Sequence, residues 1–284
     1  MVTENNASHQ KSRGAIYVVG IGPGSAEHIT PRATAAIAAS TVIVGYSTYL
    51  ELIPALIKDK TVIGTGMTQE VKRCSAALEE AARGQVVSVI SSGDPGVYAM
   101  AGLVLELIKE RAEAGVYPWS NGTDGGDAAA RPVVEIIPGV PALAACSAAL
   151  GAPLMHDFAA ISLSDRLTPW ELIERRLHAA ASSDFVIVIY NPKSKGRPSH
   201  INTARDILLN YKSGETPVGI VKGAARVDET ITITTISAML NYEIDMQTTI
   251  VIGNSQSFSY GSWIITPRGY RFAAPEKSSQ ADKG

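Results

Sequence analysis

The sequence predicts an α/β protein of two domains, and three observations carry this prediction. Short β-branched runs alternate with amphipathic stretches as far as residue 137, which is typical of a parallel sheet covered by helices on both faces. The chain has 284 residues, too many for one ordinary open-sheet domain. Several β-rich runs close the chain and indicate a mixed sheet with antiparallel pairs. We therefore expect an N-terminal parallel-sheet domain over 14–137, a C-terminal mixed α/β domain over 138–272, and polar tails at 1–13 and 273–284.

The strands expected in the first domain are short apolar runs that end near glycine or a polar turn. They cover 15–19, 41–45, 61–63, 86–90 and 132–137. Helices are expected between them: one with Thr30 as N-cap and Pro31 as first residue, one over 70–83 and one over 97–112. The stretch 114–131, rich in glycine and alanine, is expected to be an exposed loop.

The second domain is expected to begin near Pro138, where prolines and a glycine interrupt the earlier pattern. Helices are predicted over 141–150 and 199–212, and a third with Thr168 as N-cap and Pro169 as first residue. Strands are predicted over 158–163, 184–190, 217–222, 229–235, 248–253 and 262–266. The uncharged stretch 136–155 contains too many proline and glycine breakers for a membrane span, so we interpret it as a strand end, a turn and a small-residue helix.

Composition excludes several classes of function. The net charge of −2 gives no overall field that would favour nucleic acid. The two cysteines, Cys74 and Cys146, form no metal-binding pattern, and they favour a reducing compartment. Residues 1–13 lack the apolar core of a signal peptide. We therefore expect a cytoplasmic protein with no metal site, no nucleic-acid partner and no membrane segment.

The eight residues Ser91–Tyr98 form the turn around which we interpret the rest of the chain. They follow a buried strand and precede a helix, so they lie at the carboxyl end of a parallel strand, where open α/β sheets bind ligands. Gly93 and Gly96 let the backbone approach a ligand closely, and Asp94 adds a carboxylate. The alternative is a tight strand-to-helix turn with a capping aspartate.

The turn Gly20–Ser25 has part of a dinucleotide-binding pattern. The third glycine of that pattern is replaced by Ser25, and Pro23 removes an N–H group that a pyrophosphate would need. No acidic residue ends the second strand, so the pattern disfavours an NAD site. A plain structural turn remains open, but two such turns at the strand ends of one sheet favour a shared ligand site.

Two further groups of residues have both a functional and a structural interpretation. Lys193, Lys195 and Arg197 follow a strongly apolar strand and form either a solvated loop or a clamp for carboxylates. His156 and Asp157 are either an acid/base pair or structural residues. As neighbours on a strand they would point to opposite faces, so we do not expect them to meet. Neither a Gly-x-Ser-x-Gly nor a His-Glu-x-x-His motif supports a hydrolase.

Residues 15–270 resemble the tetrapyrrole methylase family. The runs that carry the resemblance are Val19-Gly20-Ile21-Gly22-Pro23-Gly24, Ser92-Gly93-Asp94-Pro95 and Ile137-Pro138-Gly139-Val140. More specific runs are similar to the branch that methylates C17 of precorrin-3B in cobalamin synthesis: His156-Asp157-Phe158, Leu167-Thr168-Pro169-Trp170, Tyr190-Asn191-Pro192 and Thr266-Pro267-Arg268-Gly269-Tyr270. The chain departs from the family pattern in a longer 114–131 loop and in Pro141, where relatives often carry threonine.

The resemblance implies a two-domain tetrapyrrole methylase-like fold, with the active-site cleft between the domains, and a homodimer. It implies an S-adenosylmethionine-dependent C-methyltransferase that acts on a precorrin-type tetrapyrrole, with or without cobalt, and contracts the ring to precorrin-4. Carried over, the cofactor contacts are Gly22, Pro23, Gly24, Ser92, Gly93, Asp94, Val97, Tyr98, Pro141, Ala142, Tyr190, Asn191 and Ala224.

The resemblance leaves other assignments open. Asp94, His156 or Asp157 would manage protons during ring contraction. Lys193, Lys195 and Arg197 fit the carboxylates of the substrate. Two alternatives remain: another precorrin methyltransferase of the family, and a nonenzymatic binder of nucleotide-like ligands.

Overall fold

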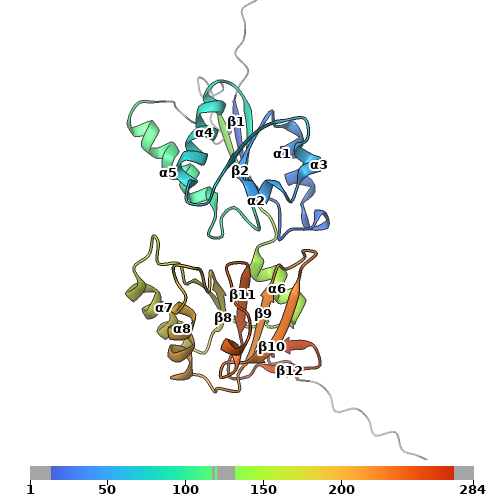
Figure 1. Cartoon of the computed structure of the whole chain (residues 1–284), viewed down its shortest axis with the longest axis vertical. Coiled ribbons are helices and arrows are strands. Elements are labelled where there is room, and N and C mark those ends of the chain that lie inside the picture. The colour runs from blue at the N-terminus through green and yellow to red at the C-terminus, as the bar shows by residue number, and fades with distance from the viewer. Residues whose placement is uncertain (1–13, 117–118, 120–131, 272–284) are drawn as a thin grey trace, which may run out of the picture. The chain divides into compact units, whose positions relative to one another are not determined.

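The computed structural model describes residues 14–116, 119 and 132–271; both predicted tails and most of the predicted 114–131 loop lie outside these residues. The chain divides into two compact units (Figure 1). Unit 1 runs to Ala149 and also includes Val221–Ile231 and Gln247–Thr249. Unit 2 comprises Leu150–Ile220, Thr232–Met246 and the chain from Ile250 onward. The sequence places the boundary earlier, after residue 137, and does not foresee the two returning segments.

Unit 1 is built on a five-stranded sheet in the order β3-β2-β4-β1-β5. Every neighbouring pair in this sheet is parallel. Buried β-branched residues fill its central strands, as expected for a sheet covered on both faces. The predicted parallel sheet is therefore confirmed. The strands are β1 (Ala15–Gly20), β2 (Val42–Tyr46), β3 (Thr61–Thr65), β4 (Val86–Ser91) and β5 (Val133–Ile137).

The helices of unit 1 lie on opposite faces of this sheet (Figure 1). Helices α4 (Glu70–Ala82) and α5 (Met100–Glu113) pack on one face, and α1 (Pro31–Ala39) packs on the other. The chain leaves β1 toward one face and the neighbouring β4 toward the other. The carboxyl ends of β1 and β4 therefore form a topological switch point, the usual ligand site of such sheets. The short helices η1 (Ala26–His28), α2 (Ser47–Leu50) and α3 (Pro54–Ile57) are not predicted from the sequence.

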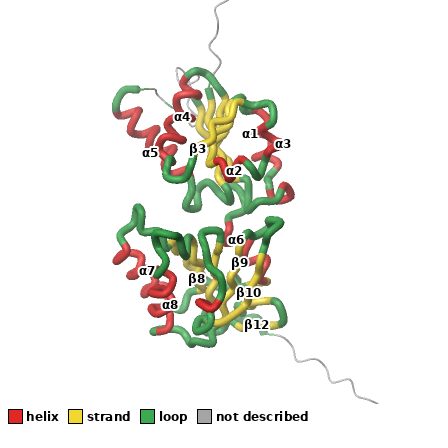
Figure 2. Tube along the Cα trace, viewed as in Figure 1, coloured by secondary structure: helices red, strands yellow, loops and turns green. Residues whose placement is uncertain are grey.

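Unit 2 contains a mixed sheet in the order β10-β9-β11-β8-β7. Its strands are drawn in yellow in Figure 2, where β8, β9 and β10 are labelled. The pair β7 and β8 is parallel, whereas β8 and β11 are antiparallel, which confirms the predicted mixed domain. Helices α7 (Trp170–Ser182) and α8 (His200–Leu209) supply Leu177 and Leu208 to its core. The strands are β7 (Phe158–Ser162), β8 (Val186–Tyr190), β9 (Pro217–Lys222), β10 (Thr230–Thr235) and β11 (Thr248–Ile252).

A small second sheet and a short helix complete unit 2. Strands β12 (Phe258–Tyr260) and β13 (Trp263–Ile265) are antiparallel, and β13 runs parallel to β6 (Gly151–Ala152). The helix η3 covers Met239–Asn241. The sequence predicts only β13 of these elements, as part of the longer run 262–266; β6, β12 and η3 lie in no run long enough to show a period.

The uncharged stretch 136–155 has the structure expected from its breakers. It contains the end of β5, a turn, and helix α6 (Ala142–Leu150), followed by β6. Among the described residues, no helix has the combined length and apolar character needed to cross a membrane.

Two helix starts share a Thr-Pro pattern, but only one follows the prediction. Thr30 caps α1, and its Oγ1 accepts a hydrogen bond of 3.1 Å from the Ala33 N–H. Helix α7 begins one residue later than predicted, with Pro169 itself at the N-cap position and no side-chain cap. The Trp170 indole donates to Glu174 Oε1 at 2.8 Å and so anchors the first turn at that position. The prediction that Thr168 caps this helix is wrong.

Candidate functional site

The two glycine-rich turns of unit 1 lie side by side at the carboxyl ends of β1 and β4. The Gly22 N–H donates to the Gly93 carbonyl at 3.1 Å, and the Gly93 N–H donates to the Gly22 carbonyl at 2.7 Å. Gly93 has φ of +67°, a conformation that disfavours side chains. The expectation that both turns belong to one site therefore has a structural basis in this paired bridge.

Asp94 connects its own turn to the segment that follows β5. Its Oδ1 accepts from the Gly96 N–H at 2.8 Å, and its Oδ2 accepts from the Gly139 N–H at 3.1 Å. A Cβ placed on Gly139 would lie 2.2 Å from the Gly93 carbonyl oxygen, so only glycine allows this approach. This contact explains why unit 1 extends beyond the predicted boundary. Sequence reasoning missed Gly139 as a donor, although its Pro-Gly turn at a strand end was a usable signal.

Gly93 faces the start of helix α6 across a narrow space. A Cβ built on Gly93 would lie 3.6 Å from Pro141 Cα and 3.7 Å from the Ala142 nitrogen, so a side chain there would fill this space. Nearby, the Ser91 Oγ is buried and has no hydrogen-bond partner among the described residues. This edge of the sheet thus combines small residues with a buried, unsatisfied hydroxyl.

The returning segment 221–231 brings Ala224 into unit 1. The turn there contains Gly223 and Ala225, both with φ near +60° (60° and 57°). The Ala225 N–H donates to Glu229 Oε2 at 2.6 Å, and Arg226 Nε donates to the Pro23 carbonyl at 2.9 Å. Every predicted cofactor residue except Tyr190 and Asn191 therefore belongs to unit 1.

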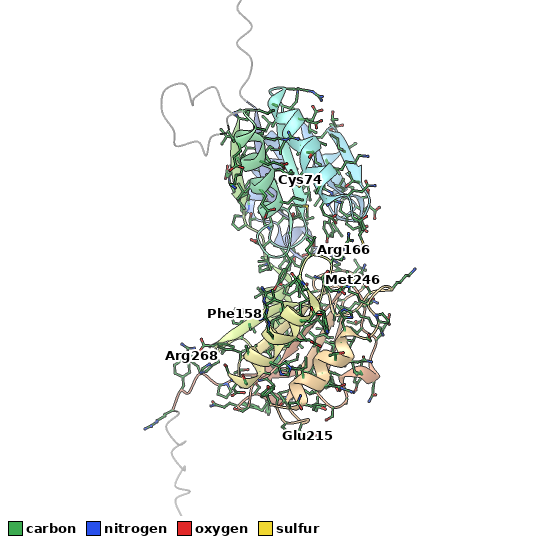
Figure 3. The ribbon with its side chains drawn as sticks, turned by 90° about the vertical axis from the view of Figure 1, so that its left-hand side faces the viewer. Cys74, Phe158, Arg166, Glu215, Met246 and Arg268 are labelled. Carbon is green, nitrogen blue, oxygen red and sulfur yellow. The ribbon has the colours of Figure 1, made fainter. Side chains whose placement is uncertain are left out.

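Tyr190 and Asn191 lie at the end of β8 in unit 2. Asn191 has φ of +50°, and its side-chain amide donates to Ser162 Oγ at 2.9 Å. The predicted cation Arg197 is buried, and its Nη1 donates to the carbonyls of Leu163 at 2.8 Å and Asn191 at 3.2 Å. It also lies 3.6 Å from the Met246 sulfur, a residue labelled in Figure 3. Arg197 thus fixes the loop.

The two lysines of the same loop differ from Arg197 in burial. Lys193 is half-buried and Lys195 is exposed. Among the described residues, neither lysine forms an ion pair, so both charges are available to an anionic ligand.

His156 and Asp157 contact each other, contrary to the sequence-based expectation. The Asp157 N–H donates to His156 Nδ1 at 2.9 Å, and Nδ1 lies 3.6 Å from Asp157 Oδ2. Both residues precede β7, so the alternation of side chains along a strand does not apply to them. Their side chains are 42% and 72% exposed, which keeps both groups available to a ligand.

Neither cysteine of the chain is suited to act as a nucleophile. Burial raises the pKa of Cys74 to about 11 and that of Cys146 to about 11. Both thiols are unpaired and buried; Cys74 is labelled in Figure 3. At neutral pH the reactive thiolate form is therefore scarce at both positions. Within the described ranges, His, Cys, Asp and Glu side chains form no group of three or more that could hold a metal ion.

The chain is similar in sequence to several known proteins. Residues 15–240 match the family described as Tetrapyrrole (Corrin/Porphyrin) Methylases. A cobalt-factor III methyltransferase of Priestia megaterium is 51% identical over 91% of this chain, which spans 46% of that protein. A probable cobalt-factor III C(17)-methyltransferase of Salmonella typhimurium is 46% identical over 90% of the chain and 99% of that protein.

Two further comparisons agree with these. A precorrin-3B C(17)-methyltransferase of a Sinorhizobium species is 40% identical over 92% of this chain and 99% of that protein. The crystal structure of the methyltransferase CobJ superimposes with a TM-score of 0.78 at 36% identity, over 89% of this chain and all of that one (100%). The predicted fold class and family are confirmed, and the chain belongs to the tetrapyrrole (corrin/porphyrin) methylase family.

Proposed function

We propose that this chain is an S-adenosylmethionine-dependent C-methyltransferase of corrin synthesis. It methylates C17 of precorrin-3B or of its cobalt-containing counterpart, with contraction of the ring to a precorrin-4-type product. The observation that carries the proposal is the paired bridge between Gly22 and Gly93 at the switch point of a tetrapyrrole methylase sheet. The names of the most similar relatives support the C17 position.

The residues at the switch point fit S-adenosylmethionine. Residues 22, 93, 142 and 224 are glycine or alanine and so take up little space at this edge, and a side chain on Gly93 would fill the space beside Pro141. The Ser91 hydroxyl at the end of β4 is buried and has no partner among the described residues. Ala224 and the Gly93 turn, both in unit 1, bind the cofactor.

When bound, S-adenosylmethionine supplies a methyl group on a positively charged sulfur, already joined to a good leaving group. The chain therefore needs to align the reacting groups and exclude water, and it needs no serine or cysteine nucleophile. Asp94 holds the Gly93 turn against Gly139 and acts as a positioning residue. His156 with Asp157 handles protons during ring contraction, and Lys193 and Lys195 bind substrate carboxylates.

The test is turnover of labelled S-adenosylmethionine with purified precorrin-3B and with its cobalt-containing form. We expect one methyl group to move to C17 of at least one of these two substrates. Transfer to a different carbon would replace the proposal by another precorrin methyltransferase of the family. Binding of S-adenosylhomocysteine without any transfer would favour a nonenzymatic binder of nucleotide-like ligands. Binding of NAD in place of S-adenosylhomocysteine would contradict the cofactor assignment.

The proposal includes a homodimer in the cytoplasm. The two unpaired cysteines favour a reducing compartment. We expect light scattering to give twice the mass of the 29.9 kDa chain at micromolar concentration. A mass equal to that of one chain across this range would contradict the dimer, and recovery of the protein outside the cytoplasmic fraction would contradict the compartment.

A further inference from the structure

Arg226 presents an oriented guanidinium group whose outer edge has no described partner. Its Nε donates to the Pro23 carbonyl at 2.9 Å, which fixes the plane of the group. Its stem lies over Gly24, where an added Cβ would approach Arg226 Cγ to 2.6 Å. Among the described residues, no carboxylate lies within ion-pair distance of this arginine, and Nη1 and Nη2 have no hydrogen-bond partner. An arginine held in this way is suited to accept a carboxylate in a two-point contact.

A second arginine and two tyrosines lie at the same carboxyl edge of the unit 1 sheet as Pro23, the partner of Arg226. Arg73 is 4% exposed; its Nε donates to Thr65 Oγ1 at 2.7 Å and its Nη2 to the Gly66 carbonyl at 3.0 Å, while Nη1 lies 3.6 Å from the Met100 sulfur. Its guanidinium carbon lies 5.8 Å from the centre of the Tyr46 ring, which meets the Tyr49 ring edge-on at 5.1 Å. Burial raises the pKa of Tyr49, while the positive charges of Arg226 and Arg73 oppose this effect. With its pKa raised, the Tyr49 hydroxyl stays a neutral hydrogen-bond donor at neutral pH.

Arg32 of the same unit has the opposite arrangement, an exposed arginine with a carboxylate partner. Arg32 forms a two-point ion pair with Glu135, although both side chains are largely exposed. Arg73 is buried, yet no carboxylate lies within ion-pair distance of it among the described residues. A buried charge without an opposite charge is costly, and a bound anion would lower that cost. This observation points to an anionic ligand at the carboxyl edge of the sheet.

We propose that Arg226, with Tyr49 and Arg73 at the same carboxyl edge of the sheet, forms a subsite for a carboxylate group. The inference rests on the proposed function, which supplies two acidic ligands. One is the tetrapyrrole, with its carboxylate side chains; the other is the cofactor, with the carboxylate of its amino acid. Both present the same chemistry, and the experiment separates them.

The experiment measures the binding of four probes to the full-length protein and to Arg226→Gln. The probes are a polycarboxylate porphyrin, its methyl ester, S-adenosylhomocysteine, and methylthioadenosine, which lacks the amino-acid carboxylate. We expect Arg226→Gln to weaken one carboxylate-bearing probe by roughly tenfold to a hundredfold, the usual effect of a charged hydrogen bond. The matching probe without the carboxylate should bind both proteins equally. Arg226→Lys keeps the charge but not the two-point geometry, so its affinity for the carboxylate-bearing probe should lie between those of the wild type and of Arg226→Gln.

The control is Arg176→Gln, which removes an exposed arginine of α7 and should change no affinity. A loss confined to the porphyrin acid assigns the subsite to the substrate, and a loss confined to S-adenosylhomocysteine assigns it to the cofactor; both support the subsite. Unchanged affinities in Arg226→Gln, or equal losses for probes with and without carboxylate, overturn it while the proposed function stands. A wild-type protein that binds none of the probes overturns both.

Discussion

Asp94 joins two turns of the candidate site through both oxygens of its carboxylate. Each oxygen accepts a backbone N–H, one from Gly96 and one from Gly139. Two backbone donors on different turns fix the carboxylate in position. These contacts favour a positioning role over proton transfer for this residue.

We expect Asp94→Asn to weaken S-adenosylhomocysteine binding by roughly tenfold, because the amide retains one acceptor and turns a donor toward the other N–H group. Methyl transfer should fall in proportion to binding and recover when the cofactor is saturating. Calorimetry and turnover on the same preparation check this, with the exposed Asp59→Asn as control. Unchanged affinity with turnover reduced by roughly two to four powers of ten would instead show a proton-transferring role.

The sequence predicts the participating turns better than the role of each side chain. Gly22, Gly93 and Asp94 follow from their place at strand ends, which a pattern of alternating strands and helices already defines. The burial of Arg197 does not follow, because a charged residue in a loop has the same local pattern whether it faces solvent or backbone carbonyls. Arg226 was missed for a related reason, since its partner Pro23 is far away in the sequence.

At the scale of elements, the two Thr-Pro helix starts show what a local pattern can predict. Both satisfy the rule for an N-cap followed by proline, yet only Thr30 makes the capping hydrogen bond. The long helices and central strands follow from their periods, whereas α2, α3, β6 and β12 are too short to show one. The first residue of α7, Trp170, donates to Glu174 one turn on, and its ring meets that of His200 in α8.

This difference gives a matched pair of substitutions. We expect Thr30→Ala to lower the free energy of unfolding by about 1 kcal/mol, because the Ala33 N–H loses its acceptor. Thr168→Ala should change it by less than about 0.5 kcal/mol, because that side chain caps no helix. Urea unfolding of both variants checks the pair. An equal loss of unfolding free energy in Thr30→Ala and Thr168→Ala would contradict the start of α7 at Trp170.

Asp184 links three segments of unit 2 that are distant in sequence. Its carboxylate accepts from the Ser255 N–H at 2.9 Å and from Lys212 Nζ at 3.3 Å. Burial raises its pKa, but the hydrogen bonds from Ser255 and the charge of Lys212 outweigh this, so the pKa of Asp184 lies below its ordinary value. The pKa of Lys212 is lowered, because burial outweighs its attraction to Asp184.

The lowered pKa of Asp184 gives the pH dependence a definite sign. The folded protein binds this proton less readily than the unfolded chain, so the stabilisation is present above the unfolded pKa of about 3.9 and is lost as the pH falls through the folded pKa. We expect Asp184→Asn to cost about 1 to 3 kcal/mol at pH 7. The difference in free energy of unfolding between Asp184→Asn and the wild type should become smaller below about pH 4. Urea unfolding at several pH values checks this, with the exposed Asp206→Asn as control. A difference that is constant with pH would contradict it.

At the scale of the whole molecule, the two units share strands. Residues 221–222 of β9, 230–231 of β10 and 248–249 of β11 belong to unit 1, while the rest of these strands belong to unit 2. The sequence predicts each strand but not this division, because nothing in a local apolar run records which core its two ends join. Ala224 and Arg226 lie between the ends of β9 and β10. If these strands left the sheet of unit 2, we therefore expect both residues to lose their place in unit 1.

This sharing predicts that the two units unfold in one transition, and the chain carries a probe for each. Cys74 and Cys146 both report on unit 1; with pKa values of about 11, they have about one thiolate per thousand molecules at pH 8 and are shielded by burial. Trp170 and Trp263 report on unit 2 once Trp119 is replaced by phenylalanine.

In a urea titration at pH 8, we expect thiol labelling and tryptophan fluorescence to change at the same midpoint, as a two-state process requires. The matched control is the same titration with S-adenosylhomocysteine, which should move both midpoints upward together by linkage. If the thiols became reactive at a urea concentration where the fluorescence was still native, unit 1 would open on its own, and the shared strands would not couple the two units.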